Sequence, residues 1–176
     1  MKTKLSALLA TTMIATPAMA DSSHDSKLDF SCQVNQGVPT TIVQFTENEA
    51  QLPIFHWKSE VVADKSNDTP QQLCNVVSEE LKNYSAQGYD LSNLNFVGTE
   101  QGGLPVICAN AGGTTCSKIL LTLNKAEQPH MVASNLVNSI LDKNLQSQKF
   151  EYRDRGVQSI SYQVDFWSLL GLSPKF

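Results

Sequence analysis

Residues 69–88 read TPQQLCNVVSEELKNYSAQG, and this stretch decides the fold. Thr69 can cap a helix, Pro70 suits its first position, and Gln72 completes a capping box. Apolar residues then recur at helical spacing, and the pattern ends near Gly88: Leu73, Val76, Val77, Leu81 and Tyr84. The stretch therefore predicts a helix with one apolar face, and Cys74 lies beside that face.

Alternating patterns on both sides of this helix predict strands. Before it, alternation begins at Leu28 and continues through 40–45 and 52–57. After it, the expected strands cover 94–99, 104–109, 119–124 and 160–166, and a second helical stripe runs from Met131 to Leu145. Strands with short connections and two separated helices favour an α+β fold with a mainly antiparallel sheet, in one domain over residues 28–172.

Composition excludes several classes of protein. The chain has 176 residues, which suits one domain, and 41% of them are hydrophobic, too many for a disordered chain. A formal charge of -4 without a Lys/Arg cluster argues against nucleic-acid binding. No apolar run approaches the ~20 residues that a transmembrane helix needs, so we expect no transmembrane segment in the mature protein.

The first twenty residues resemble a signal peptide. Lys2 and Lys4 precede an apolar stretch, and Pro17 precedes the small-x-small sequence that ends at Ala20. We expect cleavage after Ala20, a flexible N-terminus over 21–27, and export to the periplasm or cell envelope, with the thylakoid lumen or the extracellular medium as alternatives. The other interpretation of this stretch is a buried N-terminal helix.

All four cysteines lie after the expected cleavage site, and an even number in an exported chain indicates two disulfides. Three pairings are open. The glycine-containing sequence 109–115 resembles a hairpin turn that would place Cys108 opposite Cys116, which leaves Cys32 with Cys74. The spacing contains no C-x-x-C, so neither a redox-active dithiol nor a zinc site is expected.

The sequence contains no recognisable catalytic motif. G-x-S-x-G and phosphate-binding glycine loops are both missing, and Glu79 and Glu80 point apart on the expected helix. Of the three histidines, His56 is the most interesting because it stands beside Trp57 on a strand. It is either a partly buried strand histidine bonded to backbone or the base of a hydrolase with a distant carboxylate and hydroxyl. We predict no catalytic, cofactor-binding or metal-ligating residue.

Apolar and aromatic residues crowd the last eleven positions, in particular Phe166, Trp167, Leu169 and Leu170. If these side chains are exposed, they form a contact patch for a partner protein or a membrane surface. The alternative is a last strand and turn that close over the core.

The mature chain resembles the circadian oscillating protein family of cyanobacteria. The resemblance rests on cysteine-anchored motifs in a fixed order: 30–32, 39–41, 54–59, 69–74, 77–78, 104–108, Cys116, 120–123 and 162–165. It implies an exported protein, associated peripherally with membranes, that is defined by spaced cysteines and has no established enzymatic activity.

The function expected from sequence is therefore that of an exported, non-enzymatic protein that binds an unknown protein partner or a membrane surface of the envelope. A hydrolase that uses His56 and a small protein inhibitor are the alternatives.

Overall fold

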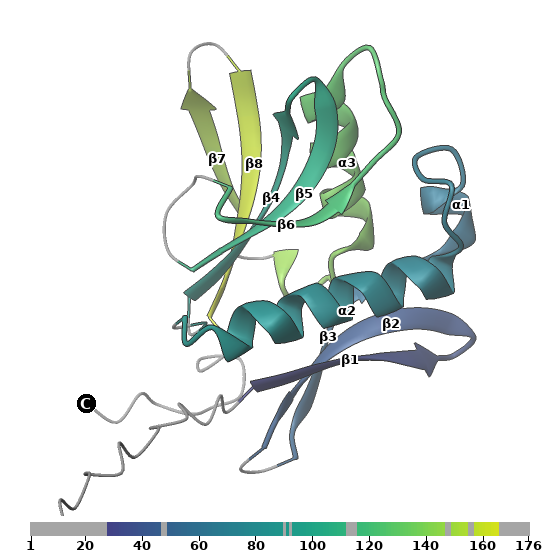
Figure 1. The fold of residues 1–176 in the computed structure, drawn as a ribbon, viewed down its shortest axis with the longest axis vertical. Helices are drawn as coiled ribbons and strands as arrows, with labels where there is room; N and C mark the ends of the chain where they lie inside the picture. The colour runs from purple at the N-terminus through teal and green to yellow at the C-terminus, as the bar shows by residue number, and fades with distance from the viewer. Residues whose placement is uncertain are drawn as a thin grey trace, which may run out of the picture.

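The computed structural model describes residues 28–46, 49–89, 91, 93–111, 116–146, 149–154 and 157–165. The expected signal peptide, the flexible N-terminus and the apolar residues from Phe166 onward lie outside these ranges. The described residues form an α+β structure with two antiparallel sheets (Figure 1).

The first sheet consists of three strands in the order β1-β2-β3: β1 (Leu28–Asn35), β2 (Val38–Phe45) and β3 (Gln51–His56). β1 and β2 form a hairpin whose two-residue turn is Gln36–Gly37, and both of these residues have positive φ (49° and 80°). Such a turn matches the natural twist of paired strands, which explains why a glycine stands at its second position.

The long helix α2 (Pro70–Ala86) packs on one face of the three-stranded sheet and also contacts β6 (Lys118–Thr122) of the second sheet (Figure 1). Its capping box is present as predicted: the Gln72 main-chain N–H donates to the Thr69 side chain, and the Thr69 main-chain N–H donates to the Gln72 side chain. A short helix, α1 (Ser59–Val62), precedes it and was not predicted.

The second sheet has five strands in the order β6-β5-β4-β8-β7: in addition to β6, these are β4 (Asn93–Gln101), β5 (Leu104–Ala111), β7 (Lys149–Asp154) and β8 (Val157–Asp165). Helix α3 (Pro129–Ile140) packs against β4 and β5. This packing depends on Gly98, because a Cβ atom there would lie 2.4 Å from the main chain of Ala133. Ser134 Oγ donates to the Gly98 carbonyl oxygen at the same contact.

One hydrophobic core joins the two sheets. Phe55 on β3 and Phe96 on β4 meet edge to face, with ring centroids 4.8 Å apart, and both are fully buried. The apolar stripe of α2 enters the same core. The antiparallel strands are thus divided between two sheets that share one interior, which alternation along the sequence does not reveal.

The end of α3 differs from the prediction. The apolar stripe predicted a helix that reaches Leu145, but the helix ends at Ile140. Leu141 forms an isolated antiparallel bridge with Phe55, and the Asp142 N–H donates to the Ile54 carbonyl oxygen. Leu145 is nevertheless buried, so the stripe identified core residues correctly although the backbone leaves the helix.

Candidate functional site

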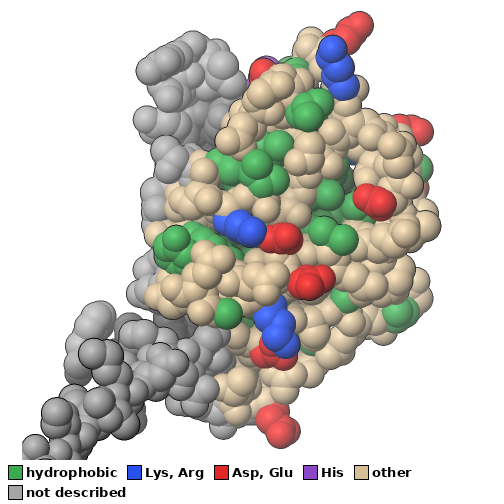
Figure 2. Space-filling view, in the orientation of Figure 1, with side chains coloured by type: hydrophobic (Ala, Val, Ile, Leu, Met, Phe, Trp, Pro, Cys, Tyr) green, Lys and Arg blue, Asp and Glu red, His purple; other side chains and the backbone are tan. Residues whose placement is uncertain are grey.

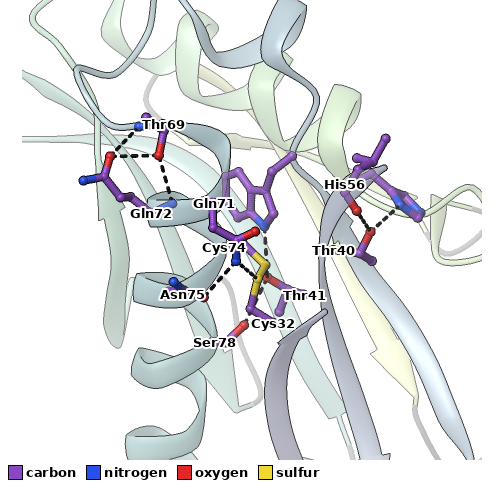
Figure 3. The surroundings of a disulfide bond; sticks show 12 residues. Cys32, Thr40, Thr41, His56, Thr69, Gln71, Gln72, Cys74, Asn75 and Ser78 are labelled. Carbon is purple, nitrogen blue, oxygen red and sulfur yellow. Dashed lines mark hydrogen bonds between the residues drawn. A yellow bond between two sulfur atoms is a disulfide. The ribbon is translucent and has the colours of Figure 1, made fainter. Parts of the chain in front are cut away.

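A cavity of about 540 Å³ lies next to the face of the three-stranded sheet that α2 leaves uncovered. Neighbouring residues on a strand point to opposite faces, so Thr41 on β2 points toward α2 and Thr40 points away from it. The cross-strand partner of Thr40 is His56, which lines the cavity. Figure 3 shows Thr40 and His56 on the opposite side of the strand from the Cys32–Cys74 disulfide.

Two parts of the chain form the walls of this cavity. The β1–β2 hairpin contributes Asn35, Gln36 and Val38, and the segment that follows α3 contributes Asp142 and Lys143. The second segment is held beside β3 by the Leu141 bridge described above. The site is therefore formed by residues that are about one hundred positions apart in sequence.

His56 Nε2 donates to Asp142 Oδ2 at 2.8 Å, and its side chain is 28% exposed compared with 13% for Asp142. The other carboxylate oxygen, Oδ1, accepts from the Asn144 N–H at 2.9 Å. This second bond closes a local turn that fixes the carboxylate. His56 is partly buried on a strand, as one interpretation of the sequence expected, but its ring bonds to a side chain rather than to the backbone. The distant carboxylate of the other interpretation is Asp142.

The remaining ring nitrogen of His56, Nδ1, lies 3.4 Å from Thr40 Oγ1. The Thr40 hydroxyl donates to the Val38 carbonyl oxygen at 3.0 Å, and Thr40 is fully buried. Both ring nitrogens thus lie within 3.4 Å of a side-chain oxygen of the protein. A histidine that serves as a general base needs a nitrogen within reach of the proton it removes, and a buried threonine hydroxyl is closed to substrate. The arrangement joins the end of β3 to the segment that follows α3.

The charged side chains that line the cavity are His56, Lys58, Asp142 and Lys143. Both lysines are exposed, and within the described part of the chain neither has a carboxylate within 4.0 Å. Asp142 is the single carboxylate among the described residues that line the cavity, and it accepts from His56 and from the Asn144 N–H. The cavity is therefore a positive region on a chain whose formal charge is -4.

The Cys32–Cys74 disulfide connects β1 to α2 on the covered face of the small sheet, with a Cα–Cα distance of 5.5 Å. Next to it, Trp57 Nε1 and Ser78 Oγ both donate to Thr41 Oγ1, at 2.9 and 3.3 Å. Thr41 Oγ1 in turn lies 3.9 Å from Cys74 Sγ, and these polar groups are buried. Figure 3 shows Thr41 and Ser78 next to the sulfur atoms, so the disulfide belongs to a buried network that joins strand and helix.

The Cys108–Cys116 disulfide, with a Cα–Cα distance of 5.3 Å, confirms the second predicted pairing. The geometric reason differs from the one expected. Cys108 on β5 pairs across the sheet with Ile119, and Cys116 precedes the first residue of β6. The bond therefore links a residue of β5 to the segment just before β6, rather than two facing strand positions. All four cysteines of the chain are disulfide-bonded.

Other residues that the sequence singled out do not gather at the cavity. Glu80 forms an ion pair with Lys118 between α2 and β6. The predicted contact patch, Phe166, Trp167, Leu169 and Leu170, lies outside the described residues. Sequence reasoning missed Asp142, whose one local signal is the spacing Asp-x-Asn in Asp142–Asn144, typical of a turn.

The described ranges also bear on metal binding and membrane crossing. No group of three or more His, Cys, Asp or Glu side chains there could hold a metal ion. None of the helices in that part of the chain combines the length and apolar composition that a membrane crossing requires.

Comparison with known proteins identifies the family of this chain. Neither a curated protein nor a solved structure matches the chain. The family model described as circadian oscillating protein COP23 matches residues 29–170, which include both disulfides and most of both sheets. The chain therefore belongs to the circadian oscillating protein COP23 family.

Proposed function

We propose that this chain is an exported, non-enzymatic protein that binds a protein partner in an oxidising compartment outside the cytosol. The observation that carries the proposal is the complete pairing of its cysteines, Cys32 with Cys74 and Cys108 with Cys116. Disulfides persist in oxidising compartments and are rare in the cytosol. The signal-peptide pattern over residues 1–20 supports the same location.

The apolar sequence near the C-terminus supplies the proposed contact. Phe166, Trp167, Leu169 and Leu170 follow directly after β8, and aromatic residues are enriched in the centres of protein interfaces. A protein partner is favoured over an anionic membrane, because basic residues that would attract lipid headgroups are few here. On the face seen in Figure 2, positive and negative side chains are interspersed. Ion pairs join Lys82 to Asp29 and Lys118 to Glu80.

The geometry at His56 supports the non-enzymatic part of the proposal. The hydrolase alternative draws on one observation, the 2.8 Å contact between His56 and Asp142 beside an open cavity. The hydroxyl within hydrogen-bond distance of the ring belongs to buried Thr40, and the exposed Ser139 hydroxyl, which also lines the cavity, donates to the Asn135 carbonyl oxygen. A hydrolase would lose its activity in a His56→Gln variant, whereas the proposed binding protein keeps its partner in the same variant.

The test uses the full chain expressed in its own cells, followed by fractionation and cross-linking. We expect the mature protein outside the cytosol and cross-linked to a protein partner, and loss of that cross-link in Trp167→Ser/Leu170→Ser. The control is Met131→Ser, which removes an exposed apolar side chain from α3. Excess synthetic peptide covering residues 166–176 should compete for the partner, which tests the contact even if the double variant fails to fold.

Three results would contradict the proposal. Recovery of the mature protein only from the cytosol would remove the export step. A cross-link that survives both the double variant and the peptide would place the contact elsewhere. Sedimentation with phosphatidylglycerol vesicles that requires Trp167 and Leu170 would replace the protein partner with a membrane surface.

A further inference from the structure

The cavity beside His56 has the size and the charge of a ligand-binding site. Its volume of about 540 Å³ falls within the range of small-molecule pockets. Two lysines line it: Lys58, which directly precedes α1, and Lys143, which lies in the segment after α3. Two cations without carboxylate partners in the described part of the chain are thus placed around one hollow.

The carboxylate of Asp142, which lines the cavity, already accepts hydrogen bonds from the protein at both of its oxygens. Asp142 Oδ2 accepts from His56 and Oδ1 accepts from the Asn144 N–H, and the side chain is only 13% exposed. An entering anion therefore meets two exposed ammonium groups and a carboxylate whose oxygens are both engaged. In a chain with a formal charge of -4, this local excess of positive charge is unusual and favours an anionic ligand.

We propose that this cavity binds a phosphate group carried on a small polar molecule. The cationic side chains are lysines, which bind phosphate as compact point charges, and among the described residues no arginine fork that would select a planar carboxylate lines the cavity. Asn35 and Gln36 of the β1–β2 turn add amide groups at the same wall. This inference does not depend on the proposed contact near the C-terminus.

The carrier of the phosphate is expected to be polar rather than apolar. A second hollow of about 340 Å³ adjoins the first along the same sheet and shares Asn35 with it. Gln33 and Gln51 line this second hollow, together with Ile42 and Pro53. Amide side chains suit hydroxyl groups, and no aromatic side chain from the described part of the chain lines either hollow to stack on a base or a sugar ring.

The experiment titrates the full, disulfide-bonded protein with glycerol 3-phosphate, with inorganic phosphate and with glycerol, at constant ionic strength, and follows backbone amides by NMR. We expect saturable shifts with glycerol 3-phosphate that cluster at residues 35–38, 56–58 and 139–146. The Lys58→Gln/Lys143→Gln variant should bind at least about tenfold more weakly, because two charge-assisted contacts are lost. The control is Lys82→Gln/Lys125→Gln, which removes the same charge elsewhere.

The outcomes separate the sources of the phosphate. Binding of glycerol 3-phosphate that requires both lysines supports a free phosphorylated metabolite. Binding only to vesicles that contain phosphatidic acid, again lost in Lys58→Gln/Lys143→Gln, supports a lipid headgroup as the carrier. The proposal is overturned if neither glycerol 3-phosphate nor the phosphatidic acid vesicles bind saturably, or if the shifts lie away from the cavity. It is also overturned if Lys58→Gln/Lys143→Gln and Lys82→Gln/Lys125→Gln weaken binding equally.

Discussion

His56 Nε2 lies 2.8 Å from Asp142 Oδ2, although the two residues are 86 positions apart in sequence. The contact joins the last residue of β3 to the segment that follows α3, next to the Phe55–Leu141 bridge. It therefore fastens the three-stranded sheet to the helix that covers the five-stranded sheet, and it fixes one wall of the cavity.

Removing this carboxylate should loosen the connection. We expect Asp142→Ala to lower the free energy of unfolding by about 2 kcal/mol, since the His56 and Asn144 N–H groups lose their acceptor. Urea unfolding measures the change. The control Lys143→Ala alters the neighbouring exposed residue and should have little effect. A double-mutant cycle with His56→Ala should show coupling of about 1 kcal/mol, and additive effects would mean that the pair contributes nothing.

Gly98 should tolerate no larger side chain. We expect Gly98→Ala to cost about 3 kcal/mol, because the added Cβ would lie 2.4 Å from the Ala133 main chain and would push α3 off β4. Gly88→Ala is the matched comparison: it has open space but a φ of 78°, and it should cost only about 1 kcal/mol. Thermal and urea unfolding compare the two, and a smaller cost at Gly98 than at Gly88 would contradict the close packing.

The two disulfides should contribute unequally to stability. The Cys32–Cys74 bond spans 42 positions and the Cys108–Cys116 bond spans 8. On the chain-entropy model, the longer loop contributes about 4 kcal/mol and the shorter about 2.5 kcal/mol. Paired Cys→Ala variants, compared by urea unfolding, should therefore show the larger loss at Cys32–Cys74. Equal losses would mean that packing, and not loop closure, dominates.

The hydroxyl of Thr41 should matter more than its methyl group. Thr41→Val keeps the shape but removes the acceptor of Trp57 Nε1 and Ser78 Oγ, and an unpaired buried donor costs about 2 kcal/mol. Thr41→Ser keeps the acceptor and loses one methyl group, which costs about 1 kcal/mol. Urea unfolding followed by tryptophan fluorescence ranks the two variants, and the reverse order would contradict the role of the network.

Local sequence patterns predicted the elements that depend on local physics. The capping box at Thr69 and Gln72 and the apolar stripe of α2 are satisfied within one helix, so they could be predicted from neighbouring residues. The glycine-containing turn predicted the pairing of Cys108 with Cys116, and the pairing of Cys32 with Cys74 followed because these two cysteines remained. The five strands of the second sheet were predicted except β7. Its short sequence, Lys149–Asp154, alternates only at Phe150 and Tyr152.

What the sequence did not predict depends on contacts between distant segments. The helix that contains Ile140 ends there because Leu141 pairs with Phe55, and no pattern near Leu141 signals that partner. The Phe55–Leu141 bridge also brings Asp142 beside His56. Both of these residues then line the cavity together with Lys58. The sequence therefore singled out His56, but it could not identify Asp142 as the partner of His56 or place Lys58 and Lys143 around one cavity.

The central claim is that the working form of this protein is fully oxidised in a compartment outside the cytosol. The most direct measurement is alkylation of the chain in rapidly quenched cells of its source, followed by mass spectrometry with and without reduction. We predict no labelled thiol before reduction, four labelled cysteines after it, and disulfide-linked peptides that contain Cys32 with Cys74 and Cys108 with Cys116. Free thiols at these positions in freshly quenched cells would contradict the account.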